Sequence, residues 1–474
     1  MLTDRLLKIK DRMFNVEMVT KKEWWGLDKT ILTSPDIEAE SIAVRKALAI
    51  NYVCNNLPLN IKDDELIVGT PNMAAVGFGY AFVQYTLESE KQAAAQKCLN
   101  ESSVWGHHPV RYDKLLSLGL SGFKAEITEK LEIEFSGPDP DTSKIDEYRA
   151  MIISLDGISD FAARYSRLAL DMAAKQKDKT RRLELLKISE ICSRVPNLAA
   201  SSFHEALMSF WLTYCIYHSC MEYLPAGRFD QYLYPYYKYD IENNIITQEE
   251  AKDLVGSCLV KFNERVQVNK DLWEDHYTFG NFSQGGNPTD PSSHIVLDNS
   301  QSYNYGLSAN HWLMNMIIGG QTPDGTDATN ELTYLVLNTW AELELVAPVL
   351  SVRFFKGSPE RLYTEVAAIL AKGGGEPAIY NDEPIIAGLV AQGIPIREAR
   401  DYSNDGCWET LIPGKTDFTY FHIEVALALE YTLFRGKSLL RDAEEGIDTG
   451  DPGSFETFED LYSAFLSQVK KKNP

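Results

Sequence analysis

The amino-acid sequence predicts an α/β protein in which a mainly helical part precedes a part that alternates strands and helices. The chain has 474 residues, which is too long for one ordinary core, so two or more large units are expected. Helix-period apolar residues dominate the first part, whereas short apolar runs bounded by glycine or proline recur from about residue 308 onward. We therefore expect residues 1–270 to be mainly helical and residues 271–474 to form the α/β part.

The helices of the first part are predicted from apolar faces and from helix breakers. We expect helices over residues 37–55, 82–99, 124–134, 145–176, 178–193, 203–220 and 251–266. Thr247 and Glu250 form a capping box at the start of the last of these helices. The segment 203–220 has apolar residues on most of its faces, which predicts a buried helix.

The second part shows the shorter elements of an α/β unit. Strands are expected over residues 348–354 and 378–380, and helices over residues 332–343, 359–371, 384–392 and 421–435. Gly436 is expected to stop the last helix. This alternation predicts strands whose helices pack beside them.

Composition and charge exclude several classes of partner and cofactor. The net charge is −22, from 46 Lys and Arg against 68 Asp and Glu, which disfavours binding to nucleic acid. Neither a secretory signal nor a membrane span is visible, and the seven cysteines include no CxxC pair. A reduced, cytoplasmic protein is therefore expected. The eight histidines form neither HxxxH nor HExxH, so no metal site is predicted.

The segment 401–416 carries the most distinctive chemistry in the chain. Cys407 follows Gly406 directly, and Glu409 stands two residues further on. In an extended loop, residues two apart point the same way, so the thiol and the carboxylate would share one face, with Trp408 turned away. Such a loop would present one sulfur and one base to a small substrate.

Three functions are possible for Cys407. A hydrolytic nucleophile needs a histidine partner, which no local signature supplies, and a redox thiol needs a resolving cysteine, which is absent locally. Radical chemistry, in which sulfur abstracts a hydrogen atom and a carboxylate moves a proton, suits Cys407 and Glu409 best. A buried loop cysteine without chemistry is the alternative.

An ordered set of motifs extends over nearly the whole chain. It comprises residues 63–69, Gly106-His107 with residues 112–114, residues 227–237, Gly319-Gly320, Asp324-Gly325, residues 327–330, 348–353, 381–383, 406–409 and 413–416. Each piece alone is weak, but the ordered set is specific. With these motifs the chain resembles the glycyl radical enzymes, the pyruvate formate-lyase-like family.

This resemblance implies a fold and two catalytic residues. The fold would be a ten-stranded α/β barrel made of two half-barrels, with the loop 401–416 as a finger that carries the cysteine inside. Cys407 would become the thiyl radical, and Glu409 would be the acid or base of the dehydratase and lyase branches. Pyruvate formate-lyase itself is disfavoured, because that enzyme uses two adjacent cysteines and Gly406 precedes Cys407 here. Trp408 stands where a small aliphatic residue is expected.

The resemblance also implies a radical cofactor and partners. The family stores its radical on a glycine near the C-terminus, in a loop similar to Arg-Val-x-Gly-Tyr, and the glycines at 414, 436, 446, 450 and 453 lack that context. We therefore expect no glycine radical domain in this chain, and an incomplete barrel from a fragment, a split gene or a degraded copy. A radical S-adenosylmethionine activase would install the radical in the missing segment. A second copy or a complementary C-terminal chain would be a partner.

The resemblance favours a lyase. The leading hypothesis is a radical dehydratase or lyase that cleaves a C–O, C–N or C–S bond in a small hydroxylated substrate, although this chain alone would be inactive. The alternatives are an aryl-acetate-type radical decarboxylase and an inactive half-protein that binds an activase or a second subunit. Substrate contacts are expected from Glu222, Tyr223, Asp156 and Trp408. A helix cap or a solvated face is the alternative for Asp156, and a place in the core for Tyr223.

Overall fold

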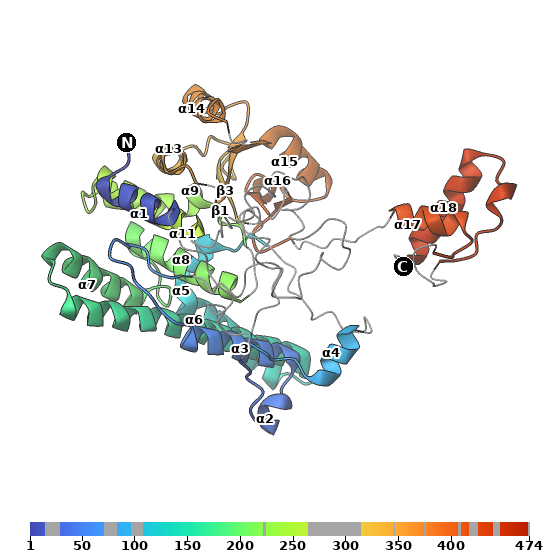
Figure 1. Cartoon of the computed structure of the whole chain (residues 1–474), viewed down its shortest axis with the longest axis horizontal. Helices are drawn as coiled ribbons and strands as arrows, with labels where there is room; N and C mark the ends of the chain where they lie inside the picture. The colour runs from blue at the N-terminus through green and yellow to red at the C-terminus, as the bar shows by residue number, and fades with distance from the viewer. Residues whose placement is uncertain are drawn as a thin grey trace. The chain divides into compact units, whose positions relative to one another are not determined.

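The computed structural model describes residues 1–14, 29–70, 83–95, 108–220, 224–263, 314–345, 347–373, 376–405, 409–416, 425–438 and 446–472. The chain divides into two compact units, Met1–Asp417 and Phe418–Pro474. Figure 1 shows the helices and strands of both units. The boundary expected near residue 270 lies outside the described residues.

A helical layer forms around the longest helix, α6 (Thr142–Lys175), which contacts α3 (Ile42–Asn56), α5 (Tyr112–Ser136) and α7 (Lys179–Arg194) (Figure 1). Asp141 caps the start of α6, where its carboxylate accepts two backbone N–H groups of the first turn. The expected helices over 145–176 and 178–193 are thus confirmed to within a few residues. Further helices in this part are α1 (Asp4–Phe14), α2 (Pro35–Glu38), α4 (Glu88–Ala95), α9 (Phe229–Tyr232), α10 (Tyr234–Glu242) and α11 (Gln248–Asn263).

The helix α8 (Phe203–Ser219) lies at the centre of the larger hydrophobic core. Phe210, Trp211 and Tyr214 on this helix are at most 1% exposed. The indole N–H of Trp211 donates to the carbonyl of Gly69 at 2.8 Å, so the one polar atom of this buried ring is satisfied. The prediction that this helix is buried is confirmed for these residues.

A parallel sheet of four strands lies beside the helical layer. Its strands run in the spatial order β1 (Gly227–Arg228), β2 (Asn315–Gly319), β3 (Val349–Phe354) and β4 (Ala378–Asn381). Helix α13 (Glu331–Leu343) connects β2 to β3 and α14 (Glu360–Leu370) connects β3 to β4, whereas α15 (Asp382–Ala391) and α16 (Ile396–Ala399) follow β4. The predicted α/β class is confirmed, since parallel strands need helical crossovers of this kind.

The two faces of the sheet pack into two separate hydrophobic cores. Along β2, Met316 and Ile318 belong to the core shared with the helices, whereas Ile317 between them belongs to a smaller core. The smaller core contains Tyr380 of β4 and Tyr402, which follows α16. Because side chains alternate along a strand, both faces are buried by different parts of the chain.

The structure differs from the sequence prediction at β1 and α4. Residues 227–228 form the first strand of the sheet, although no strand was expected there. The two-residue strand is too short to show the alternation by which strands are recognised. The helix expected over 82–99 is described only as Glu88–Ala95, and residues 83–87 are not helical.

The helix α5 begins at Tyr112, twelve residues earlier than expected, because it continues through a break at Gly119. Gly119 has φ of +67°, and a Cβ there would lie 2.4 Å from the backbone carbon of Leu198. The amides just after the break donate to the carbonyls of Pro196 and Asn197. The break therefore fits α5 against the turn after α7, and a glycine is needed for this close approach.

The second unit contains α17 (Val425–Leu433), a short 3-10 turn (Pro452–Ser454) and α18 (Phe458–Lys472). The side-chain amide of Gln468 on α18 exchanges two hydrogen bonds with the backbone of Ile447, at 2.6 and 2.9 Å. Within the described residues of the whole chain, no helix has the length and hydrophobicity that a membrane span requires.

Buried polar contacts tie the loop that follows α3 to the helices α11 and α8. Lys261 of α11 donates to Glu65 at 2.7 Å, and their side chains are 2% and 3% exposed. One residue further along this loop, the carbonyl of Leu66 lies 2.9 Å from Nε2 of His204 on α8. Burial, opposed by this hydrogen bond, lowers the pKa of His204 from 6.5 to about 4.

The lowered pKa of His204 predicts a loss of stability in mild acid. The folded state keeps the imidazole neutral, whereas the unfolded state takes up a proton near pH 6.5, so stability is lost as the pH falls from about 6.5 towards 4. His204→Gln removes this titration but keeps a side-chain N–H for Leu66. Urea unfolding at pH 7 and pH 5 should show a smaller pH-dependent loss for this variant. Parallel profiles for both proteins would contradict the assignment.

Candidate functional site

The segment around Cys407 is held by a β-hairpin. Its strands β5 (Ser403–Asn404) and β6 (Thr410–Leu411) are antiparallel, and the amide of Asp405 donates to the carbonyl of Glu409 at 2.8 Å. Cys407 and Trp408 lie between these last two residues and outside the described part of the chain. The two residues that flank this tip are therefore fixed to each other by the backbone.

The first strand of the hairpin lies across one face of the parallel sheet. The side-chain amide of Asn315, at the start of β2, donates to the carbonyl of Asp405 at 2.6 Å. The side-chain amide of Asn404 donates to the hydroxyl of Ser351, in the middle of β3, at 3.2 Å. All four residues are fully buried, so the hairpin is enclosed against the sheet on polar contacts that water does not weaken.

Arg353 at the end of β3 fixes the residues that lead into the hairpin. Its guanidinium makes two hydrogen bonds to Asp382, at 2.8 and 2.9 Å, and donates to the carbonyls of Arg400 and Tyr402, at 2.8 and 2.9 Å. The Tyr402 ring lies 3.8 Å from the guanidinium, and its hydroxyl donates to Asp382 at 2.9 Å. Arg353, Asp382 and Tyr402 are fully buried.

The charge of Arg353 is retained in spite of its burial. Burial opposes the charged form, but Tyr402 and Asp382 outweigh this effect, and the pKa of Arg353 is raised. Space for the guanidinium depends on Gly320, where a Cβ would lie 2.5 Å from Nε of Arg353. The close approach and the φ of +82° both require glycine at this position.

A second arginine holds the same segment from the end of β1. Arg228 donates to Asp401 at 2.5 Å and to the carbonyls of Gln321 and Gly319, at 2.8 and 3.1 Å. Burial and the neighbouring Arg353 lower the pKa of Arg228. Two arginines at the carboxyl ends of β1 and β3 thus hold residues 400–402 in place, immediately before the hairpin.

A polar cleft of about 410 Å³ adjoins these residues, between residues 110–113, 227–232, 397–401 and 412–415. Its cationic side chains are each paired with a carboxylate: Arg111 with Asp113, Arg228 with Asp401, Arg397 with Asp324 and Lys415 with Glu398. The cleft is therefore lined by compensated charges and does not present a free cationic surface to an anion.

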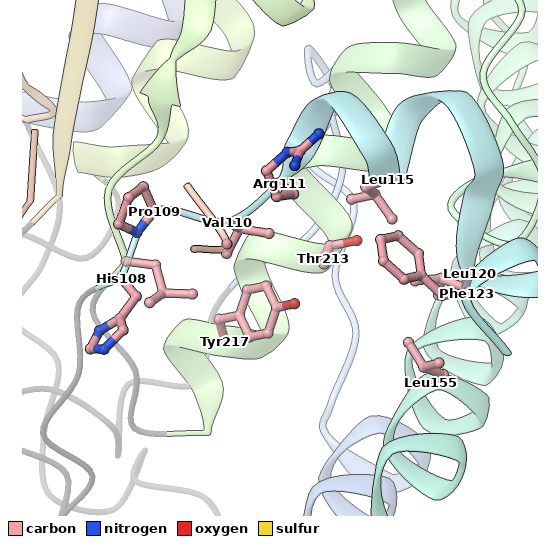
Figure 2. A pocket seen from close by; sticks show the side chains of 12 residues that line it. His108, Pro109, Val110, Arg111, Leu115, Leu120, Phe123, Leu155, Thr213 and Tyr217 are labelled. Atoms are coloured by element: carbon pink, nitrogen blue, oxygen red, sulfur yellow. The ribbon is translucent and has the colours of Figure 1, made fainter. Parts of the chain in front are cut away.

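An apolar cavity of about 620 Å³ lies between α5, α6 and α8 (Figure 2). Arg111 and Val110 line both this cavity and the polar cleft. Gly414, near the end of the hairpin segment, also lines the cavity, and a Cβ there would lie 2.6 Å from the Arg111 side chain. The loop that follows β6 thus packs against Arg111, the residue that lines both the polar cleft and the apolar cavity.

The predicted site residues fall into three groups. Glu409 is half-buried at the base of the hairpin tip, next to the residue that follows Cys407. Asp156 lies on α6, where its 48% exposed side chain makes an ion pair with Lys124 at 2.5 Å, and it does not line the polar cleft or the apolar cavity. Glu222 and Tyr223, like Cys407 and Trp408, lie outside the described residues.

No metal centre is found among the described residues, in which no group of three or more His, Cys, Asp or Glu side chains converges. The described cysteines at positions 54, 192, 215, 220 and 258 are all buried. Burial raises the pKa of Cys54, Cys192 and Cys258, which keeps these thiols protonated and unreactive.

Comparison with known proteins places the chain in a family. A sequence profile described as "Pyruvate formate lyase-like" matches residues 79–471, most of the chain. The chain belongs to the pyruvate formate lyase-like family. This result confirms the resemblance to glycyl radical enzymes that the motifs predicted.

Individual relatives come from the dehydratase and lyase branch of this family. An isethionate sulfite-lyase of Nitratidesulfovibrio vulgaris is 34% identical over 374 residues, which are 77% of this chain and 41% of that protein. A trans-4-hydroxy-L-proline dehydratase of Clostridioides difficile is 30% identical over 367 residues, 76% of this chain and 43% of that protein. The chain thus spans less than half the length of these two relatives.

Solved structures confirm the barrel fold. A glycyl radical enzyme from Archaeoglobus fulgidus superposes with a TM-score of 0.75 at 26% identity, over 99% of this chain and 63% of that chain. The expected fold class, a helical layer with part of the glycyl radical enzyme barrel, is therefore correct. The described parallel sheet and the hairpin on its face are pieces of that barrel.

Sequence reasoning missed the residues that position the hairpin. Arg353, Asp382 and Arg228 were noted only as parts of family motifs, without a role. One signal was available, because Arg353 interrupts an otherwise apolar strand, and a buried charge needs a partner. The identity of that partner, 29 residues further along the chain, could not be inferred from sequence.

The buried position of Arg353 predicts a large cost for a conservative change. Arg353→Lys keeps one positive charge but loses the planar fork that serves four acceptors, so the free energy of unfolding should fall by about 3–5 kcal/mol. A matched control is Arg361→Lys on α14. Arg361 also pairs with a carboxylate, Glu365, and lies 3.8 Å from a tyrosine ring, but it is 63% exposed.

The control variant should lose less than about 1 kcal/mol in the same urea titration. Amide hydrogen exchange adds a local readout, because the Asp405 amide should exchange faster in Arg353→Lys and at an unchanged rate in Arg361→Lys. Equal losses of stability in the two variants would show that Arg353 does not anchor the hairpin.

Proposed function

We propose that the chain supplies the thiyl cysteine of a radical lyase that cleaves a C–O, C–N or C–S bond in a small hydroxylated substrate. The observation that carries this proposal is the hairpin whose first strand is buried and whose residues Asp405 and Glu409 flank Cys407 in the sequence. A radical thiol needs a position that excludes water and is reproducible, and the contacts from Arg353, Asn315 and Asn404 would provide it. The named activities of the relatives support the same reaction class.

In the proposed reaction, Cys407 transfers hydrogen atoms and Glu409 transfers a proton. The sulfur of Cys407, as a thiyl radical, takes a hydrogen atom from the carbon that bears the hydroxyl group, so an S–H bond forms and a C–H bond breaks. Glu409 accepts the hydroxyl proton, and the substituent on the neighbouring carbon leaves with its bonding electron pair and takes that proton from Glu409. The product radical then regains a hydrogen atom from the Cys407 thiol, which restores the thiyl radical.

The radical on Cys407 would come from a glycine radical, which supplies a stored unpaired electron. The described glycines that follow Cys407 have other local roles. Gly414 packs on Arg111, and the amide of Gly446 donates to the carbonyl of Gly436 at 2.9 Å. The amide of Gly450 donates to Asp448 at 3.0 Å. We therefore propose that the radical glycine belongs to another segment, where a radical S-adenosylmethionine activase would install it.

An exposed apolar groove favours the existence of a partner chain that completes the barrel. In the described sheet, β4 pairs only with β3, and its residue Ile379 is 53% exposed. Ile379 lines a groove of about 640 Å³ together with Phe354 of β3 and Tyr363 and Leu370 of α14. An edge strand with an apolar face is a template for a further strand and helix. We propose that a complementary C-terminal chain or a second copy of this chain covers it.

The thiyl role predicts that Cys407→Ser abolishes turnover and leaves the fold intact. The assay uses enzyme assembled without oxygen from this chain, the polypeptide that carries the radical glycine, and the activase. Electron paramagnetic resonance should still detect the glycine radical in this variant, because only its transfer to sulfur is lost. Cys192→Ala, at a buried cysteine on α7, is the control and should retain activity. Turnover by Cys407→Ser near the wild-type rate would refute the thiyl assignment.

The acid–base role predicts that Glu409→Gln lowers kcat by about two to four orders of magnitude, the usual scale for a positioned acid or base. Glutamine keeps the size and the backbone hydrogen bond to Asp405 but cannot accept the hydroxyl proton. Glu360→Gln, at an exposed position on α14, is the control and should leave kcat unchanged. An unaffected kcat in Glu409→Gln would leave Glu409 with a structural role only.

A further inference from the structure

The apolar cavity beside the hairpin has the dimensions of a small-molecule site. Its volume of about 620 Å³ falls within the range of about 300–1,000 Å³ that such sites occupy. Its walls come from three helices and three loops: His108, Pro109, Val110, Arg111, Leu115, Leu120, Phe123, Leu155, Thr213, Tyr217, Leu224 and Gly414. Ligand binding in this cavity does not depend on the function of Cys407.

Most of the wall is hydrocarbon. Leu115, Leu120 and Phe123 face the cavity from α5, and Leu155 faces it from α6 (Figure 2). The break at Gly119 in α5 separates the first of these side chains from the other two, so the helix presents both sides of the kink to the cavity. Such a surface favours an apolar ligand, because contact with it removes hydrocarbon from water.

The cationic side chain at the edge of the cavity is already neutralised. Arg111 makes two hydrogen bonds to Asp113, both 2.7 Å long, through Nε and Nη2. This bidentate geometry satisfies the guanidinium face that would otherwise bind a carboxylate or a sulfonate. Asp113 thus offsets the charge of Arg111, so an anionic ligand gains less from this side chain than from an unpaired arginine, whereas an uncharged ligand loses nothing.

Two hydroxyl groups on α8 give the cavity a polar side. Figure 2 shows the hydroxyls of Thr213 and Tyr217, one helical turn apart, directed toward Phe123 and Leu155. Thr213 is 1% exposed, and its hydroxyl finds no hydrogen-bond partner within the part of the chain that the structure describes. A buried hydroxyl is unfavourable unless it is paired, and a ligand with one polar group would satisfy it.

We propose that this cavity binds an uncharged, largely apolar small molecule that carries a single hydroxyl or N–H group, for which phenol serves as a minimal probe. The apolar walls enclose the ring, and Thr213 pairs with the polar group. Compensation of Arg111 by Asp113 makes the site discriminate against anions of the same size. Nothing in this assignment requires a radical or a second chain.

Isothermal titration calorimetry of the full chain with phenol, toluene and benzoate tests the proposal. Phenol should bind, toluene should bind more weakly, and benzoate should show no heat at the same concentrations. Thr213→Val, which has nearly the same shape, should weaken phenol about fivefold, as expected for one lost hydrogen bond, and leave toluene unchanged. Benzoate binding as tight as that of phenol, or an absence of phenol binding at millimolar concentration, would overturn the proposal.

Filling the cavity gives an independent test. Leu155→Trp should weaken phenol binding, because the larger ring takes part of the space opposite Thr213 and Tyr217. Leu183→Trp, at a 59% exposed leucine on α7, is the control and should leave phenol binding unchanged. Thermal unfolding establishes whether each variant is folded, and if Leu155→Trp is not, the Thr213→Val comparison decides. An unchanged phenol affinity in folded Leu155→Trp would place the ligand elsewhere and refute the assignment.

Discussion

The arrangement of the site depends on the buried ion pair between Arg353 and Asp382. A lysine could neutralise the carboxylate, but only the planar guanidinium can reach Asp382 twice and donate to two backbone carbonyls as well. Those carbonyls belong to Arg400 and Tyr402, the residues that lead into the hairpin. A buried charged group with four of its five N–H donors assigned to fixed acceptors favours one geometry, so the pair specifies where the hairpin lies on the sheet.

The turn after β2 makes this ion pair possible. Gly319 and Gly320 both have positive φ, and the absence of a side chain at Gly320 leaves room for the guanidinium of Arg353. The amide of Gln321, the next residue, donates to Asp382 at 3.0 Å, and the amide of Gly319 donates to Asp230 at 2.9 Å. The carboxyl ends of neighbouring parallel strands therefore share one polar network, at the sheet edge where α/β proteins assemble their sites.

The two hollows near the hairpin differ in chemistry because different elements build them. The polar cleft lies between segments that carry Arg228, Asp401 and other paired charges, and these pairs are needed to hold the loops at the strand ends. The apolar cavity lies between helices whose inner faces are hydrophobic for packing, and side chains from both sides of the kink at Gly119 line it. The charged pairs of the cleft thus position backbone segments, whereas the helix packing around the cavity leaves a space for a ligand.

The sequence by itself determined the secondary structure of the long helices, the α/β class and the family. Helix periods and caps are local, so α6, α7 and α8 could be read from residues close together in the chain. The chemistry of Cys407 and Glu409 was also inferred locally, from their spacing and from the surrounding motif. Strand β1 was missed because two residues carry too little pattern, and the early start of α5 was missed because the close packing at Gly119 is not a local property.

Only the tertiary structure decided which residues hold the hairpin and where the hollows lie. The partners of Arg353 come from two separate segments, and the contact from Asn315 to Asp405 joins residues 90 positions apart. Nothing in the spacing of such residues encodes their contact, because it arises only when parallel strands bring distant carboxyl ends to one edge. The cavity beside α8 is likewise a property of three packed helices, since no single helix reveals which of its apolar side chains will lack a partner.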